Sequence, residues 1–344
     1  MKTRILVVVA AMMLLFSCAE KRTNPLIQNL DNSWIVTTDT LDIKMQVDIP
    51  SVIQADMYEN GLIPHPYKSN IEPQLLWIPQ HEWTYTLDFN AEDYILNEDV
   101  VELVFEGLDT YADVWFNGEH ILYSDNMFRT YSCDVKNLIK EKNNIKIKFH
   151  PFDKVRDSLI KTYPLRFPEK YAVMRKAAYQ NGWDWAPRYM NMGIWQPVYL
   201  KAWTHSTISS ESVITTDIQD NKAQLAFEVC VDADVKHEIT LQLFENNSKI
   251  IDETIELDEG KNYHSFPFEI SDPKLWYPNE LGEQNMYTFN LKMVDNDEDK
   301  IIEERDITMG IRTIEMIEEP DSIGTALYFK VNGTPLYMKG ANYI

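Results

Sequence analysis

The sequence predicts an all-β protein with two antiparallel sandwiches in series, a jelly roll followed by an immunoglobulin-like domain. Short runs of strand length recur along the chain, some alternating between apolar and polar residues and some continuously apolar. Asn-Gly pairs and prolines separate these runs, as turns do between antiparallel strands. The length of 344 residues exceeds one ordinary domain, so we expect two or three.

The first domain is expected over residues 24–205. Its opening part is rich in proline and includes a short predicted helix near residues 55–59. Strands are predicted over residues 83–89, 100–105, 112–116, 121–123, 145–149 and 199–203. The Asn117–Gly118 pair predicts a hairpin turn between two of these strands. Many short strands with such turns are typical of a jelly-roll sandwich.

The second domain is expected over residues 206–318, because the composition changes near residue 205. Eight of the nine tryptophans precede that point, and only Trp276 follows it. Strands are predicted over residues 213–217, 223–231, 238–244, 249–255, 263–270, 286–294 and 302–309. Seven strands at this spacing are typical of an immunoglobulin-like sandwich.

The end of the chain, residues 319–344, is predicted to begin a further unit. Tyr328–Val331 and a segment from Leu336 to Ile344 flank the Asn332–Gly333 pair, which predicts a hairpin that enters a new strand.

Residues 1–18 have the pattern of an export signal. Lys2 and Arg4 precede an apolar run, Ile5–Phe16, that is too short to span a bilayer as a mature helix. The run ends at Cys18 in a sequence that resembles a bacterial lipoprotein box. We therefore expect an exported protein, periplasmic or at the cell surface, that is anchored to the membrane by lipid on Cys18. The alternative is an ordinary signal peptide with an incidental cysteine.

The overall charge and the scattered histidines and cysteines exclude several functions. A net charge of −22 offers no basic surface for nucleic acid, so a neutral or weakly charged ligand fits better. The seven histidines show no ligand spacing, and no glycine-rich phosphate loop is present. We predict no metal and no cofactor. Cys133 and Cys230 lie in different expected domains, which argues against a disulfide.

The segment from Arg175 to Val198 is the strongest candidate for a binding site. It contains Asp184 between two tryptophans, Trp183 and Trp185. If residues 183–185 are extended, the tryptophans point to one face and Asp184 to the other. Aromatic rings stack on the C–H faces of a sugar, and a carboxylate accepts hydrogen bonds from its hydroxyls. The alternative is that the tryptophans belong to the core and Asp184 caps a turn.

Several blocks of the chain share their residue pattern with one known family. The blocks are Asp56–Tyr67, Gly107–Ala112, Asp125–Arg129, Arg175–Ala177, Gly182–Trp185, Gly193–Trp195, Leu275–Asn279 and Gly310–Arg312. In these blocks the chain resembles β-mannosidases of glycoside hydrolase family 2. Ala186 stands where that family has glycine, and Tyr277 and Glu280 are milder departures.

The resemblance implies a galactose-binding-like jelly roll, an immunoglobulin-like sandwich and then a catalytic (β/α)8 barrel. Asn332–Gly333 and Lys339–Asn342 resemble the entry to that barrel, of which this chain would contain only the first strand. Both catalytic glutamates of the family lie at the ends of barrel strands, beyond the end of this chain. We therefore expect no catalytic residue in this chain, and we expect the chain alone to be inactive. Asn97–Glu98 and Asn279–Glu280 resemble the family's acid/base dipeptide by coincidence.

The activity implied is that of a retaining exo-β-mannosidase, which releases terminal non-reducing β-D-mannose from a glycan or oligosaccharide. The implied substrate-binding residues are Trp183, Asp184, Asn126 and Arg129. Arg175 and Lys176 are alternatively expected to hold the loop against Asp184 or a glutamate. Two other functions stay open: another glycosidase of the family, of the β-galactosidase or β-glucuronidase type, and a non-catalytic carbohydrate-binding lipoprotein.

Overall fold

A computed structural model describes residues 25–38, 40–68, 70–162, 169–296 and 300–342. Contacts divide the described chain into two compact units. One consists of Pro25–Thr207 together with Asp232–Val235, and the other comprises the remaining described residues from Ile208 onward. The predicted export signal and Cys18 lie outside the described residues. Among those that are described, no helix is both long and apolar enough to cross a membrane.

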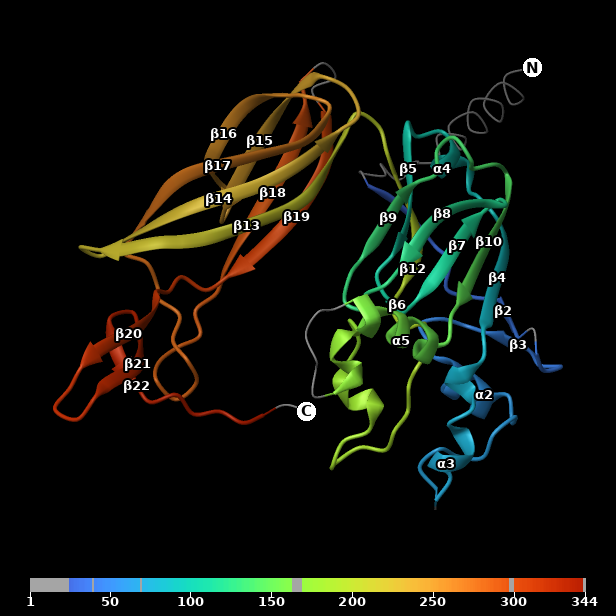
Figure 1. Ribbon diagram of the computed structural model, residues 1–344. Helices are drawn as coiled ribbons and strands as arrows, with labels where there is room; N and C mark the ends of the chain where they lie inside the picture. The colour runs from blue at the N-terminus through green and yellow to red at the C-terminus, as the bar shows by residue number, and fades with distance from the viewer. Residues whose placement is uncertain (1–24, 39, 69, 163–168, 297–299, 343–344) are drawn as a thin grey trace, which may run out of the picture. The chain divides into compact units, whose positions relative to one another are not determined.

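The first unit is an antiparallel sandwich (Figure 1). Its six-stranded sheet has the order β3-β2-β4-β10-β7-β8, and its four-stranded sheet has the order β1-β12-β5-β9. The larger sheet contains β3 (Lys44–Val47), β2 (Trp34–Thr37), β4 (Trp83–Asn90), β10 (Lys142–Phe149), β7 (Ala112–Phe116) and β8 (Glu119–Ser124). The smaller contains β1 (Leu26–Asn29), β12 (Val198–Trp203), β5 (Val100–Phe105) and β9 (Tyr131–Asp134). A short pair joins β6 (Leu108–Asp109) to β11 (Gly193–Ile194).

Alternating burial along the strands forms the core of this unit. In β10, Ile145, Ile147 and Phe149 are fully buried, and they alternate with more exposed lysines. On the neighbouring β4, Trp83 and Tyr85 are buried in the same way. Burying each large apolar side chain contributes about 1.5–3 kcal/mol before the entropy of ordering is subtracted. The sandwich predicted from this alternation is confirmed.

The predicted hairpin at Asn117–Gly118 is also confirmed. Both residues have positive φ, 51° and 89°, and they connect β7 to β8. Two consecutive positive φ values are what a tight hairpin turn between twisted strands requires.

The helices of this unit lie in the connections between its strands. The helix expected near residues 55–59 is α2 (Ile53–Glu59), and the chain reaches it directly after β3 and a short turn. The sequence analysis missed α5 (Phe152–Thr162), in which Phe152 is buried and Val155 and Leu159 are partly buried against the core. The shorter helices are α3 (Glu72–Leu75), η1 (Ile78–Gln80), α4 (Asp93–Leu96), η2 (Lys170–Val173) and η3 (Ala178–Asn181).

The second unit contains the seven predicted strands in two antiparallel sheets, which confirms the immunoglobulin-like sandwich. One sheet contains β13 (Ser206–Gln219), β14 (Lys222–Ala233) and β17 (Gly260–Ser271). The other contains β16 (Ser248–Leu257), β15 (His237–Glu245), β18 (Tyr287–Asp295) and β19 (Lys300–Met309). Cys133 and Cys230 are both free thiols.

The C-terminal part of this unit forms a three-stranded antiparallel sheet of β20 (Ile314–Pro320), β21 (Thr325–Val331) and β22 (Thr334–Leu336). The predicted turn at Asn332–Gly333 connects β21 to β22, with φ of 51° and 74°. Residues 337–342 have no regular structure. The first strand of a catalytic barrel therefore stays a prediction.

Candidate functional site

The structure brings two of the predicted segments side by side. The backbone N–H of Met127 donates to the carbonyl of Arg175 at 3.0 Å, next to an isolated bridge between Asn126 and Arg175. The indole N–H of Trp195 donates to the carbonyl of Met127 at 3.0 Å. The loop that contains Asn126 and Arg129 is therefore attached to both ends of the tryptophan-rich segment.

A buried ion pair fixes the start of that segment. The ammonium of Lys176 contacts the carboxylate of Asp109 on β6, and both side chains are almost wholly inaccessible. The same nitrogen donates to the carbonyl of Asn191 at 2.6 Å and lies 4.4 Å from the centroid of the Phe152 ring. Burial lowers the pKa of Lys176 to about 8, and the Asp109 carboxylate opposes that shift.

The expected partner of Lys176 was wrong. The sequence analysis paired it with Asp184 or a glutamate, whereas the structure pairs it with Asp109. Lys176 and Asp109 are 67 positions apart, and the β6–β11 pairing helps to bring their surroundings together.

Gln180 extends this buried network. Its amide nitrogen donates to the second carboxylate oxygen of Asp109 at 3.3 Å, and its amide oxygen accepts from the backbone N–H of Asn191 at 3.0 Å. Each hydrogen bond is worth about 1 kcal/mol net, and more where one partner is charged. The base of the segment is thus held by polar contacts that would be costly to break.

The tip of the segment is a turn and not a strand. The Trp183 N–H donates to the Ala186 carbonyl at 3.1 Å, and the Ala186 N–H donates back to the Trp183 carbonyl at 3.4 Å. Gly182 precedes this turn with φ of 93°, a conformation that side chains disfavour. The alternation expected for an extended segment at residues 183–185 therefore does not apply.

Both tryptophans of the tip are exposed, Trp183 by 53% and Trp185 by 47%, so neither is a core residue. Asp184 is exposed as well. Within the described residues its carboxylate makes no hydrogen bond or ion pair, which disfavours the alternative in which Asp184 caps a turn. The roles of Trp183 and Asp184 in sugar binding stay predictions.

The loop with Asn126 and Arg129 is held by its own hydrogen bonds. The Asn126 side-chain oxygen accepts from the Phe128 N–H at 2.9 Å, and the Asn126 N–H donates to the Tyr131 hydroxyl at 3.0 Å. Arg129 is exposed. The carboxamide oxygen of Asn126 is therefore partly committed to the loop, and the roles of Asn126 and Arg129 in substrate binding also stay predictions.

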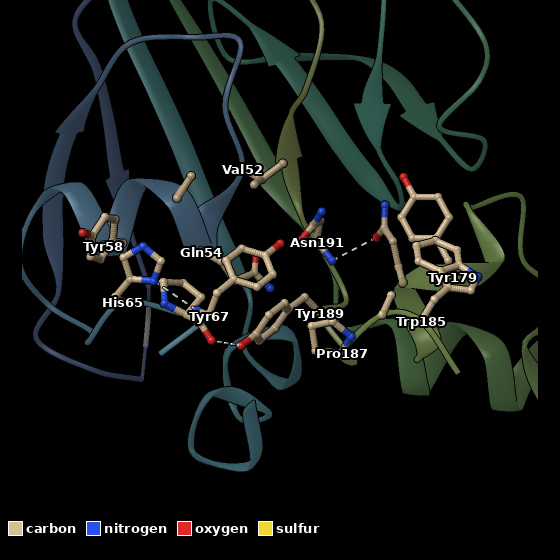
Figure 2. A pocket seen from close by; sticks show the side chains of 14 residues that line it. Val52, Gln54, Tyr58, His65, Tyr67, Tyr179, Trp185, Pro187, Tyr189 and Asn191 are labelled. Carbon is tan, nitrogen blue, oxygen red and sulfur yellow. Dashed lines mark hydrogen bonds between the residues drawn. The ribbon is translucent and has the colours of Figure 1, made fainter. Parts of the chain in front are cut away.

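A pocket of about 490 Å3 opens beside the tip of the segment. Figure 2 shows Tyr58, His65 and Tyr67 on one side and Tyr179 and Trp185 on the other, with Tyr189 and Pro187 between them. Trp185 lines this pocket, whereas Trp183 and Asp184 do not. The sequence analysis missed the pocket because its aromatic residues, such as Tyr67 and Tyr189, come from segments about 120 positions apart.

Backbone hydrogen bonds join the two walls of the pocket. The Ser51 N–H donates to the Ile194 carbonyl at 2.9 Å, and the Ile53 N–H donates to the Met192 carbonyl at 2.8 Å. Gly193 allows this close approach, since a Cβ there would lie 2.9 Å from the Ser51 carbonyl oxygen. The start of α2 is thereby fixed against β11.

The carboxylate of Asp56, a residue of α2, links the helix to the preceding loop and to β4. This carboxylate accepts from the Ser51 hydroxyl at 2.5 Å and from the Tyr85 hydroxyl at 3.1 Å. Burial raises the pKa of Asp56 to about 6, although both hydrogen bonds act in the opposite direction. The adjacent residues Gln54 and Ala55 line the pocket.

Comparison with known proteins identifies the class to which these domains belong. Residues 30–196 match the family model described as the glycosyl hydrolase 2 galactose-binding domain-like, and residues 207–312 match the model for glycosyl hydrolases family 2. The chain therefore belongs to glycosyl hydrolase family 2 and contains its N-terminal domains.

Relatives within this family are named β-mannosidases. The chain is 27% identical over 340 residues to a β-mannosidase from Rattus norvegicus, covering 92% of this chain and 38% of that protein. It is 30% identical to β-mannosidase B from Emericella nidulans, covering 86% and 36%. A crystal structure of β-D-mannosidase from Dictyoglomus thermophilum superposes with a TM-score of 0.85 at 30% identity, covering 93% of this chain and 40% of that one. The chain thus spans less than two fifths of the length of the curated relatives it matches.

Proposed function

We propose that this chain is the N-terminal part of a retaining exo-β-mannosidase that hydrolyses terminal non-reducing β-D-mannose. The likeness to the D. thermophilum β-D-mannosidase over 93% of the chain, at a TM-score of 0.85, is the observation that supports this most directly. The rat relative, aligned over 92% of the chain, supports the same substrate class.

The chemistry of such an enzyme needs two carboxylates about 5 Å apart, one as the nucleophile and one as the acid/base. The resemblance assigns both to glutamates of a catalytic barrel beyond residue 344. In this proposal the described domains contribute contacts to the sugar. Asp184 would accept hydrogen bonds from hydroxyls, and Trp183 would stack on a sugar face.

The exposed tip and its buried base suit that role. A ligand-binding carboxylate must be accessible, and its position must be fixed before the ligand arrives. Asp184 is exposed, while Lys176, Asp109 and Gln180 hold the segment below it.

A panel of aryl glycosides tests the proposal on the complete polypeptide that contains this chain. We expect hydrolysis of the β-mannoside with retention of configuration at the anomeric carbon. Preferential hydrolysis of the β-galactoside or the β-glucuronide would contradict the proposal in favour of another activity of the family. Absence of hydrolysis with every glycoside would favour the non-catalytic carbohydrate-binding protein.

We also propose that the protein is exported and anchored by lipid on Cys18, on the basis of the sequence pattern alone. A Cys18→Ser variant should then move from the detergent phase to the aqueous phase on detergent partitioning. Unchanged partitioning would contradict lipidation and indicate an ordinary signal peptide.

A further inference from the structure

We propose that the pocket between α2 and the tryptophan-rich segment binds a neutral oligosaccharide, and that its ligand is a β-linked manno-oligosaccharide. The choice of mannose rests on the proposed function, whereas the choice of a neutral glycan rests on the pocket itself. Its volume of about 490 Å3 falls within the range of about 300–1,000 Å3 that is usual for small-molecule sites.

The walls of the pocket present aromatic rings that are partly exposed. Tyr67 is 74% exposed, and Tyr58, Tyr179 and Trp185 are each between 43% and 47% exposed. The exposure of large aromatic rings to water is unfavourable. A cluster of such rings around one pocket therefore indicates a binding surface. Flat rings with open faces suit the C–H faces of a pyranose.

Neighbouring rings hold these side chains in place. Tyr67 meets the Tyr189 ring edge-on at 5.7 Å, and Tyr58 meets His65 in the same manner at 5.0 Å. On the opposite wall, Tyr179 and Trp185 lie 5.5 Å apart. Because the rings support one another, little side-chain freedom would be lost when a ligand binds.

The lining also limits the charge of the ligand. None of the fourteen described lining residues is an aspartate, glutamate, lysine or arginine. A phosphate or a uronic acid would find no basic partner there, and a cation would find no acidic one. Uncharged hydroxyls next to apolar C–H faces fit such a ring-lined, uncharged pocket.

Isothermal titration of the full chain with β-1,4-mannotriose tests this proposal. We expect saturable binding, and we expect Tyr67→Ala and Trp185→Ala each to weaken it by about tenfold, because each variant loses an aromatic contact with the sugar. The matched controls are Tyr263→Ala, whose tyrosine is also 74% exposed, and Tyr123→Ala, whose tyrosine is 45% exposed. Neither residue lines the pocket.

Two outcomes would overturn the proposal. One is the absence of binding at millimolar mannotriose, which would leave another segment of a longer polypeptide as the occupant of the pocket. The other is binding that Tyr67→Ala and Trp185→Ala do not change, with thermal melting of both variants confirming that they are folded. Failure of the proposed function would show separately, in the glycoside panel, because the titration needs no catalysis. Binding of cellotriose in place of mannotriose would retain the glycan site and reject mannose as its ligand.

Discussion

The base and the tip of the segment from Arg175 to Trp195 differ in what determines their geometry. At the base, Lys176 and Asp109 form an ion pair that is almost wholly removed from water, and Gln180 adds a further hydrogen bond. At the tip, Trp183 and Asp184 are exposed, and only a two-way backbone hydrogen bond with Ala186 shapes the turn.

The difference separates stability from recognition within one short segment. A buried pair is strongly destabilising when only one partner is removed, because the other charge remains without compensation. Removing an exposed carboxylate changes the stability of the protein little, since the carboxylate interacts mainly with water. Substitutions at the base should therefore affect folding, and substitutions at the tip should affect ligand binding.

The largest expected effect concerns catalysis, which neither the base nor the tip supplies. We expect this chain alone not to hydrolyse an aryl β-mannoside detectably, because the resemblance assigns both catalytic carboxylates to the barrel. A sensitive fluorogenic assay measures this. Turnover that survives purification and disappears when a residue between 25 and 342 is mutated would contradict it.

Removing one partner of the buried pair should have the largest effect on folding. Lys176→Met should lower the free energy of unfolding by about 3–5 kcal/mol, because it leaves the Asp109 charge uncompensated. Chemical denaturation measures this. The matched control is Lys222→Met, which breaks the exposed Lys222–Glu269 pair and should cost about 1 kcal/mol or less. Equal losses of unfolding free energy in the two variants would contradict the expected difference between the buried pair at the base and the exposed Lys222–Glu269 pair.

Asp184→Ala tests the tip in the complete polypeptide. We expect kcat/KM for a β-mannoside to fall by about 1.5–3 kcal/mol of transition-state binding, the value of a charge-assisted hydrogen bond, with little change in melting temperature. Steady-state kinetics and thermal melting on the same variant separate the two roles. A lowered melting temperature with unchanged kcat/KM would remove Asp184 from the site and make it a structural residue.

The buried carboxylate of Asp56 should have a smaller effect on stability, and this effect depends on pH. Its pKa is raised to about 6 in the folded protein, so the folded state binds more protons than the unfolded state between about pH 4 and 6. This contribution to stability is present in full below about pH 4, and it is lost as the pH rises through 6. It is on the order of 3 kcal/mol, from the rise of the pKa from its ordinary value of 3.8 to about 6.

The Asp56→Asn variant provides the reference for this measurement, because asparagine does not titrate. The difference in unfolding free energy, wild type minus variant, should fall between pH 4 and pH 7. A difference that is constant over this range would mean that Asp56 titrates at its ordinary pKa.

Local patterns in the sequence were enough to predict most of the strands and turns. The seven strands of the second unit, the hairpins at Asn117–Gly118 and Asn332–Gly333, and helix α2 were all predicted and are confirmed. Their signals are local, since alternation reports which face is buried and an Asn-Gly pair adopts positive φ readily. Helix α5 was not predicted, although Phe152, Val155 and Leu159 recur at helical spacing and pack against the core.

The local geometry of the predicted site differs from the expectation, whereas the roles of its residues stay predictions. Trp183 and Asp184 are accessible, as a binding role requires, but the turn at residues 183–186 replaced the extended strand on which their alternation depended. Gly182 and Pro187, next to that turn, are both typical of turns and were the available local signal.

The sequence by itself determined the two sandwiches, their turns and the family resemblance, because each depends on residues close together in the chain. Only the tertiary structure decided that Lys176 pairs with Asp109 and that Gln54 and Tyr67 face Trp185 across a pocket. These contacts join residues 67 or more positions apart, so neither periodicity nor spacing reports them. They arise when the β6–β11 pairing and the close approach at Gly193 bring distant segments together, and burial then makes the resulting polar contacts costly to break.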